Sequence, residues 1–461
     1  MNLPKGFENY FLRHWKEEDL KALVQGLEAE PSVSIRLNTK RLAADSVPAG
    51  ADGRVPWCPE GIYLKTRPTF TADPLLHAGA YYVQEASSMF LAHVLRSLDS
   101  QPSFPHAPFH CALDLCAAPG GKSTLLRSLL PDDCLLVSNE PNRTRCQVLA
   151  ENLAKWRHPN VLVTQAYASD LAQAVSDKAV LLQKDALFLP PFDLILADVP
   201  CSGEGMMRKE AEAIAQWSPE FVAECASLQR SIVRDIWPAL APGGILIYST
   251  CTFNPEEDEN NVEWIARELG ADVISIPTEA TWGIRGDLRR KPLVPDSSPS
   301  ASASESCPNS PALLPCYHFL PGQVRGEGFF LAVLRKHGIP RDSAPGESAA
   351  EEPRSPKKKA KKQKGRPPQA PPFPILPIDQ LDQEGAAQVE LSLVDSIRFL
   401  QREALVLPPD TPRGIVQVCY RGQRLGLMNN LGSRANNLYP KEWRIRSSYV
   451  TPASLFDPPS E

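Results

Sequence analysis

The sequence predicts an α/β protein in which a doubly wound parallel sheet has a smaller domain on each side. Two observations predict this fold class. Residues 81–292 alternate short apolar runs with amphipathic stretches, which is the pattern of parallel strands joined by helices. Proline accounts for 46 of the 461 residues, about twice its usual share, so part of the chain must be linker.

Changes in composition predict the domain organisation. The N-terminal part mixes helical stretches with a β-type run at Val33–Asn38, and the C-terminal part carries strand-like runs at Gly414–Tyr420 and Arg424–Met428. A Ser-rich insert in the middle part is expected to be a disordered surface loop, and a Pro- and Lys-rich stretch is expected to be a linker. The predicted parts are an N-terminal subdomain at 1–80, a core at 81–336 with the insert at about 296–311, a linker at 337–374 and a C-terminal domain at 375–461.

The charge balance limits the classes of function. A net charge of −5 (49 Lys and Arg against 54 Asp and Glu) excludes a uniformly basic protein that coats nucleic acid. Residues 354–366 nevertheless carry eight basic and no acidic residues. This run is either a solvated tether or a tether that also binds phosphates.

No long apolar run or secretion signal is present, so we expect a cytoplasmic protein without a membrane span. The 11 cysteines are odd in number and form no CxxC pair or zinc-finger spacing. They therefore predict reduced thiols and no metal site.

A small-residue loop between an apolar strand and a helix is the most informative local segment. Leu113–Leu115 lead into Cys116–Lys122, which reads CAAPGGK, and a helix follows. Glycines allow a ligand to approach the backbone closely, and the first N–H groups of a helix favour polar or anionic groups. The loop lacks the spacing of a P-loop and of a dinucleotide fingerprint. It therefore predicts a ligand site of another kind.

Acidic residues end the neighbouring strands. Glu140 follows the apolar run Leu135–Asn139, at the place where doubly wound folds bind a nucleoside ribose, although a plain acid at a helix start is the alternative. Asp198 ends the run Phe192–Ala197. The carboxyl ends of these strands should meet at one crevice, which is the expected ligand site.

Two cysteines follow strands at the same expected edge. Cys201 comes after Asp198, in the segment DVPCSGEG, and Cys251 comes after the apolar run Gly244–Tyr248. A single cysteine at a strand end is often structural. Two cysteines beside a ligand loop favour catalysis, because a thiolate that adds to C6 of a cytosine turns C5 into an enamine carbon that can accept a methyl group.

At this point a family resemblance becomes specific. The segments LDLCAAPGGK (113–122), DVPCSGEG (198–205) and YSTC (248–251) resemble motifs of the Nol1/Nop/Sun family of RNA cytosine-C5 methyltransferases. The resemblance covers residues 1–336. Residues 421–440 resemble the RNA-binding PUA-like end of bacterial 16S rRNA members of that family. The resemblance implies a Rossmann-like methyltransferase core, an N-terminal RNA-binding subdomain and a C-terminal PUA-like domain.

The resemblance also implies roles for single residues. Cys251 matches the nucleophile that attacks C6, and Cys201 matches the second cysteine, which helps release the methylated adduct. Asp198 matches the acid that orients the cytosine and lies near the methyl donor. The residues that match the site for S-adenosylmethionine are Cys116, Ala117, Ala118, Pro119, Gly120, Gly121, Lys122 and Glu140, together with Asp198.

The acid that contacts the adenine in this family has no clear counterpart. Spacing from Glu140 places Tyr167 there, and an inserted stretch follows it. We expect Asp185 to take this role, with stacking by Tyr167 or a contact from Asp170 as the alternatives.

The resemblance therefore predicts an enzyme that transfers a methyl group from S-adenosylmethionine to C5 of a cytosine in RNA. The expected partner is 16S rRNA or a 30S particle, and the chain is expected to act as a monomer. One alternative is the same chemistry on tRNA. The other is a catalytically silent RNA-binding factor of ribosome assembly. The presence of both cysteines and of Asp198 argues against this alternative.

Overall fold

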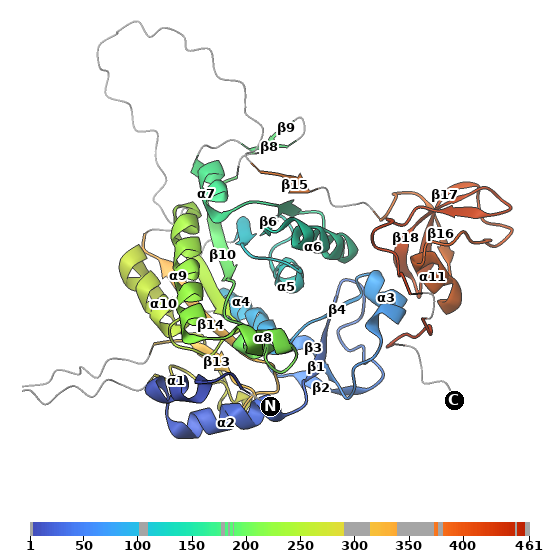
Figure 1. Cartoon of the computed structure of the whole chain (residues 1–461). Helices are drawn as coiled ribbons and strands as arrows, with labels where there is room; N and C mark the ends of the chain where they lie inside the picture. Colours follow the sequence, from blue (N-terminus) through green and yellow to red (C-terminus); the bar gives the residue numbers. More distant parts are fainter. Residues whose placement is uncertain are drawn as a thin grey trace, which may run out of the picture. The chain divides into compact units, whose positions relative to one another are not determined.

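Figure 1 shows the computed structural model of the chain. The structure describes residues 3–100, 109–176, 180–182, 185–187, 189–289, 314–338, 373–376, 381–447 and 450–456, with only the backbone given for 180–187. The Ser-rich insert and the basic run at 354–366 lie outside these residues. One compact unit comprises Met1–Pro31, Leu196–Trp237 and Ile245–Gly338, and the other comprises Ser32–Ile195, Pro238–Gly244 and Ile339–Glu461.

The central sheet has nine strands and confirms the predicted α/β class. Its strands are β5 (Cys111–Asp114), β6 (Leu135–Asn139), β7 (Val161–Thr164), β10 (Phe192–Asp198), β11 (Leu240–Thr250), β12 (Ala271–Ile274), β13 (Tyr317–Phe319), β14 (Phe329–Lys336) and β15 (Ile375–Leu376). Their order is β12-β14-β11-β10-β5-β6-β7-β15, and β13 pairs with β14. β5, β6 and β7 are parallel, whereas β14 runs antiparallel to β11, β12 and β13. β15 runs antiparallel to β7 at the opposite edge, so the sheet combines parallel strands with antiparallel strands at both sides.

Aromatic side chains form the core of the first unit around its N-terminal helices. This unit holds α1 (Phe7–His14), α2 (Glu17–Glu28), α8 (Ala211–Gln216), α9 (Pro219–Ile236) and α10 (Glu259–Trp264), the last continued by a π-helical turn at Ile265–Gly270. Phe7, Trp217 and Phe253 lie in one buried cluster, with the rings of Phe7 and Trp217 5.0 Å apart. A Cβ atom at Gly26 of α2 would lie 2.0 Å from the carbonyl oxygen of Pro321. Only glycine therefore allows α2 to approach this segment.

The second unit contains the first small sheet and the helices around the parallel strands. The sheet has the order β2-β3-β1-β4, with β1 (Val33–Leu37), β2 (Ala51–Val55), β3 (Cys58–Leu64) and β4 (Tyr81–Val83). β1 matches the predicted run at Val33–Asn38. The helices are α3 (Pro74–His77), α4 (Phe90–Ser100), α5 (Gly121–Leu129), α6 (Arg143–Trp156) and α7 (Ala168–Ser176), and β8 (Val180–Leu182) pairs with β9 (Asp185–Leu187).

The C-terminal domain is a four-stranded sheet with one helix (orange to red in Figure 1). Its elements are β16 (Ala387–Glu390), α11 (Leu393–Leu400), β17 (Gly414–Tyr420), β18 (Gln423–Asn430) and β19 (Ala435–Asn437). Arg421 and Gly422 connect β17 to β18, both with positive φ, as tight hairpin turns require. The two predicted strands of this domain are thus confirmed.

This domain packs against the N-terminal strands. Its core residues Val416 and Leu425 belong to the same buried cluster as Ile35 and Leu75 of the N-terminal strands and α3. The Leu455 N–H donates to Asp73 Oδ2 at 3.0 Å, and Arg157 pairs with Asp382 at 2.9 Å. The sequence could not show this, because the contacts join residues hundreds of positions apart. Among the helices that the structure describes, none is long and apolar enough to cross a membrane.

Candidate active site

Two thiols meet at the ends of consecutive strands. Cys201 follows β10 and Cys251 follows β11, and their sulfur atoms lie 3.1 Å apart. This is a hydrogen-bonding contact, longer than the ~2.05 Å of a disulfide, and both cysteines are free. The Gly205 N–H donates to the carbonyl oxygen of Cys251 at 2.8 Å, which holds the two loops together. The structure therefore brings together the two cysteines that the sequence singled out.

The two thiols are not equivalent. The hydrogen bond with Cys251, together with burial, raises the pKa of the Cys201 thiol well above its usual range. Cys201 therefore keeps its proton, which makes it a proton donor and a poor nucleophile. The sulfur of Cys251 is within hydrogen-bonding distance of this proton donor.

A pair of buried carboxylates clamps the two cysteine loops to each other. Glu204, in the Cys201 loop, accepts hydrogen bonds from the N–H groups of Phe253 (2.6 Å) and Asn254 (3.1 Å), just after Cys251. Glu257, beyond the Cys251 loop, accepts from the N–H of Ser202 at 3.0 Å. Each loop thus supplies the acid that binds the backbone of the other.

Side chains complete this clamp. The Asn254 amide nitrogen donates to both Glu204 (3.1 Å) and Glu257 (2.8 Å), so it bridges the two carboxylates. Trp217 donates to Glu204 at 2.8 Å, and Gln229 donates to Glu257 at 2.6 Å. Buried carboxylates are tolerated when several N–H groups satisfy them. Sequence analysis missed their role; the available signal for Glu257 was the acidic run 256–259, which begins six residues after β11 ends, and no such run marks Glu204.

Burial, with a smaller effect of the Glu257 charge, raises the pKa of Glu204 to about 7. The folded protein keeps this proton up to about pH 7, whereas the unfolded chain releases it near ~4.3. The folded state therefore binds more protons in this window, so its stability falls as pH rises through it, by roughly 3 kcal/mol from this group.

We expect Glu204→Gln to show a flatter fall in the free energy of unfolding between about pH 4.5 and 7 than the wild type, because glutamine has no proton to release. Urea denaturation at a series of pH values measures this. Other buried acids are present in both proteins, so the difference reports on Glu204 together with its electrostatic effect on Glu257 and Asp258. Parallel profiles for the two proteins would contradict the assignment.

Asp198 lies at the end of β10, three residues before Cys201. The hydroxyl group of Ser249, on β11, donates to Asp198 Oδ1 at 2.8 Å. This bond fixes the orientation of the carboxylate, so the acid is held beside the cysteine loops within the same unit.

The predicted ligand loop, in the second unit, connects β5 to α5. Gly120 takes φ = +112° and caps α5, a conformation that favours glycine. The Ser123 hydroxyl group donates to Asp114 at 2.6 Å, and the Ala117 N–H donates to the carbonyl oxygen of Asn139 at 2.7 Å. These bonds fix the loop at both ends. The carbonyl oxygens of Ala118 and Pro119 are engaged by Arg145 and Asn152 of α6.

Glu140 follows β6 and is only 2% exposed. Its Oε1 accepts from the Asn142 N–H at 3.0 Å, which is the helix-start role that the sequence left open. Its Oε2 has no hydrogen-bond partner among the described residues and lies 3.5 Å from Arg145. One oxygen is thus used locally, and the other is buried, lies in an ion pair with Arg145 and accepts no hydrogen bond from the described residues.

The three candidates for an adenine contact differ in surroundings. Tyr167 follows β7 and is 71% exposed, and its N–H donates to Asp170 at 3.2 Å, so that carboxylate already serves the local turn. Asp185 begins β9, and its side chain lies outside the described residues. Its role stays a prediction.

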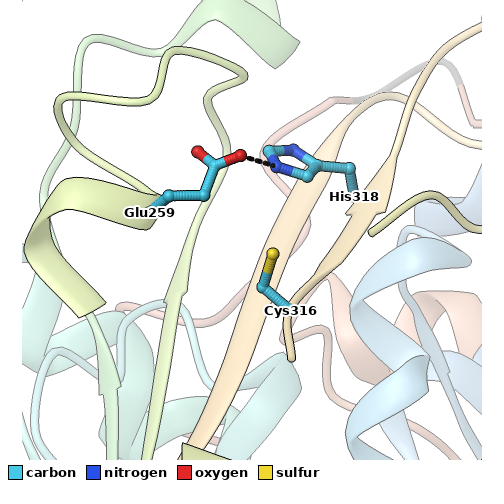
Figure 2. A group of neighbouring side chains, drawn as sticks. All are labelled: Glu259, Cys316 and His318. Carbon is cyan, nitrogen blue, oxygen red and sulfur yellow. Dashed lines mark hydrogen bonds and ion pairs between the residues drawn. The ribbon is translucent and has the colours of Figure 1, made fainter. Parts of the chain in front are cut away.

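Three side chains of kinds that bind metals meet where the sequence predicted no metal site. Glu259 of α10 and His318 of β13, with Cys316, are buried, and one ligand atom of each lies within 4.8 Å of the others (Figure 2). His318 Nε2 and Glu259 Oε1 are hydrogen-bonded at 3.0 Å. In this arrangement the two atoms satisfy each other and tie α10 to β13. The sequence could not reveal this group, because Glu259 lies 57 positions before Cys316 in the chain.

Comparisons with known proteins identify the family of the chain. The family model described as 16S rRNA methyltransferase RsmB/F matches residues 106–335. The model for the N-terminal domain of 16S rRNA methyltransferase RsmF matches residues 3–86, and that for the methyltransferase RsmF PUA domain matches residues 386–445.

Relatives and solved structures point the same way. The chain is 32% identical over 314 residues to ribosomal RNA small subunit methyltransferase F of Cronobacter sakazakii (66% of this chain, 56% of the relative). It is 31% identical over 333 residues to that of Pectobacterium atrosepticum (70% and 60%). The matched region is thus less than two thirds of these relatives.

Two solved proteins of Pyrococcus horikoshii share the fold. A methyltransferase homolog protein is 22% identical with a TM-score of 0.52, covering 72% of this chain and 94% of that one. NSun6, solved with SFG, is 20% identical with a TM-score of 0.51, covering 72% and 98%. Because the three domain models match successive parts of the sequence, the chain belongs to the RsmB/F family of 16S rRNA methyltransferases.

Proposed function

We propose that this chain transfers a methyl group from S-adenosylmethionine to C5 of a cytosine in RNA, with 16S rRNA as the substrate. The observation that carries the proposal is the pair of thiols 3.1 Å apart, one of which has a strongly raised pKa. Enzymes that methylate an amino group need no thiol, whereas C5 of cytosine becomes nucleophilic only after a nucleophile adds to C6.

Three residues of the first unit have separate roles in the proposed reaction. Cys251 forms the bond to C6, and Asp198, held by Ser249, orients the cytosine. After methylation and loss of the C5 proton, the bond between Cys251 and C6 breaks. Cys201 assists this release, because its protonated thiol lies within hydrogen-bonding distance of the departing sulfur.

The loop Cys116–Lys122 and Glu140 suit S-adenosylmethionine, which supplies an electrophilic methyl group. Glu140 Oε2, which accepts no hydrogen bond from the described residues and is paired only with Arg145, offers an acceptor for the ribose hydroxyl groups. The glycine conformation at Gly120 lets the backbone approach the ligand closely. We propose Asp185 as the adenine contact, and the family match supports the remaining residues of the set.

We expect Gly120→Val to weaken binding of S-adenosylmethionine at least about tenfold, because a side chain is strained at this φ. Its Cβ would also lie 3.3 Å from the Leu149 side chain. Isothermal titration calorimetry measures the affinity. Gly286→Val is the matched control, since open space surrounds Gly286. An unchanged affinity in Gly120→Val would place the cofactor elsewhere.

The substrate is tested by mapping 5-methylcytosine in total RNA with and without the gene. The expected result is one cytosine of 16S rRNA that loses its methyl group and regains it when the gene is restored. Purified protein offered a 16S transcript, 30S particles and tRNA then identifies the form that is methylated. Methylation confined to tRNA would establish the alternative substrate, and none on any RNA would support a silent assembly factor.

A further inference from the structure

Two adjoining pockets open where the N-terminal strands meet the C-terminal domain, within the second unit. The larger, about 420 Å³, is lined among others by Arg41, Leu42, Val47, Arg421, Gln423 and Phe456. The smaller, about 130 Å³, is lined among others by Lys40, Arg41, Arg127, Trp156, Arg157 and His158. Arg41 lines both, so the two pockets adjoin at this residue, and together they are called the double pocket.

The lining of the double pocket is basic. Its lining residues include five Lys or Arg residues and no Asp or Glu: Lys40, Arg41, Arg127, Arg157 and Arg421. Two nearby acids, Asp132 and Asp382, already form ion pairs with basic residues. Asp132 binds Lys40 at 2.6 Å, and Asp382 binds both Arg157 (2.9 Å) and Arg424 (3.4 Å).

Arg41 has the charge of Asp382 nearby but forms no ion pair with it. No carboxylate lies within ion-pair distance of its guanidinium among the residues that the structure describes. Its backbone is nevertheless fixed, because the Gln423 side chain donates to its carbonyl oxygen at 2.9 Å. Burial, together with the charge of Arg157, lowers the pKa of Arg41 to about 10. An anion bound here would offset this unfavourable placement.

Apolar side chains complete the larger pocket. Leu42, Val47 and Phe456 line it beside the guanidinium groups, and Val47 is 67% exposed. A basic surface next to exposed apolar side chains suits a nucleotide, whose phosphate needs cations and whose base needs an apolar contact. An inorganic anion would not use the apolar side.

We propose that this double pocket binds a single-stranded segment of RNA, with a phosphate at Arg41 and a neighbouring base against Leu42 and Val47. The proposal rests on the proposed function, since it supposes an RNA substrate. It adds a contact that lies outside the cysteine loops and that reads the backbone of the RNA, not its sequence.

The test uses the full chain and two RNAs. One is a 16S transcript, and the other is a 20-residue oligouridylate, which contains no cytosine and so cannot be methylated at C5. For Arg41→Ala we expect the affinity for both RNAs to fall about fivefold at 0.1 M salt, with the log–log salt slope smaller by ~0.7. Arg41→Lys, which keeps the charge, should restore the slope.

Arg413→Ala is the matched control. Arg413 directly precedes β17 and Arg421 directly follows it, so the control removes a cation of the same domain at the far end of that strand. It should leave both quantities unchanged. Thermal melting of each variant shows whether the fold is intact.

The proposal is overturned if Arg41→Ala and Arg413→Ala bind oligouridylate equally well, with the same salt slope. It is equally overturned if 4-thiouridine in this RNA crosslinks only outside residues 40–47 and 421–424. Failure of the proposed function would give a different result. The wild-type protein and the Arg41 variants would then all fail to methylate RNA.

Discussion

Cys251→Ser should reduce methyl transfer to RNA by about 10⁴-fold or more, the order of effect seen when a covalent nucleophile is removed. A serine hydroxyl group is far less ionised than a thiol at neutral pH, so it cannot add to C6. Transfer of a labelled methyl group to the substrate RNA measures the rate. Cys225→Ser is the control, because Cys225 lies buried in α9.

The covalent step can be seen directly with RNA that contains 5-fluorocytosine, whose fluorine blocks the final elimination. The wild type should form a stable adduct, and Cys251→Ser should form none. An adduct of this variant that maps to Cys201 would reverse the assignment of the two thiols.

Cys201→Ala should have the opposite signature, with protein accumulating on ordinary RNA as a covalent complex. The variant retains the nucleophile but loses the protonated thiol 3.1 Å from its sulfur, so release should slow by about 10²–10⁴-fold. A slowly migrating gel band that nuclease removes would reveal the complex. Normal turnover would reduce Cys201 to a structural residue.

The sequence predicts those parts of the molecule that local patterns determine. The run Val33–Asn38 forms a strand because apolar and polar residues alternate in it, and Gly414–Tyr420 forms one because it is rich in β-branched residues. The cysteines meet because each follows a buried strand, and strand order then places the two loops side by side. Each strand, and each cysteine that follows a strand, can be recognised from about a dozen residues. The pairing of the two loops also requires the strand order of the fold.

The buried acids of the clamp could not be predicted in this way. Glu204 and Glu257 would ordinarily be exposed. Their burial depends on donors from distant elements, namely Trp217 before α9 and Gln229 within it. The pair formed by Glu259 and His318 has the same origin, since its two members lie far apart in the chain. Tertiary partners, not local propensity, decide such positions.

The core that the first strands share with the C-terminal domain has a consequence during synthesis of the chain. Ile35 and Leu75 leave the ribosome early, whereas Val416, Leu425 and Leu455 of the same cluster are among the last residues made. At about 5–20 residues per second, the roughly 370 residues between β4 and Ala453 take about 20–75 s. Throughout that time the apolar side of the N-terminal strands lacks its partner. The nascent chain therefore exposes this apolar surface until its end is made, and a prematurely terminated chain exposes it permanently.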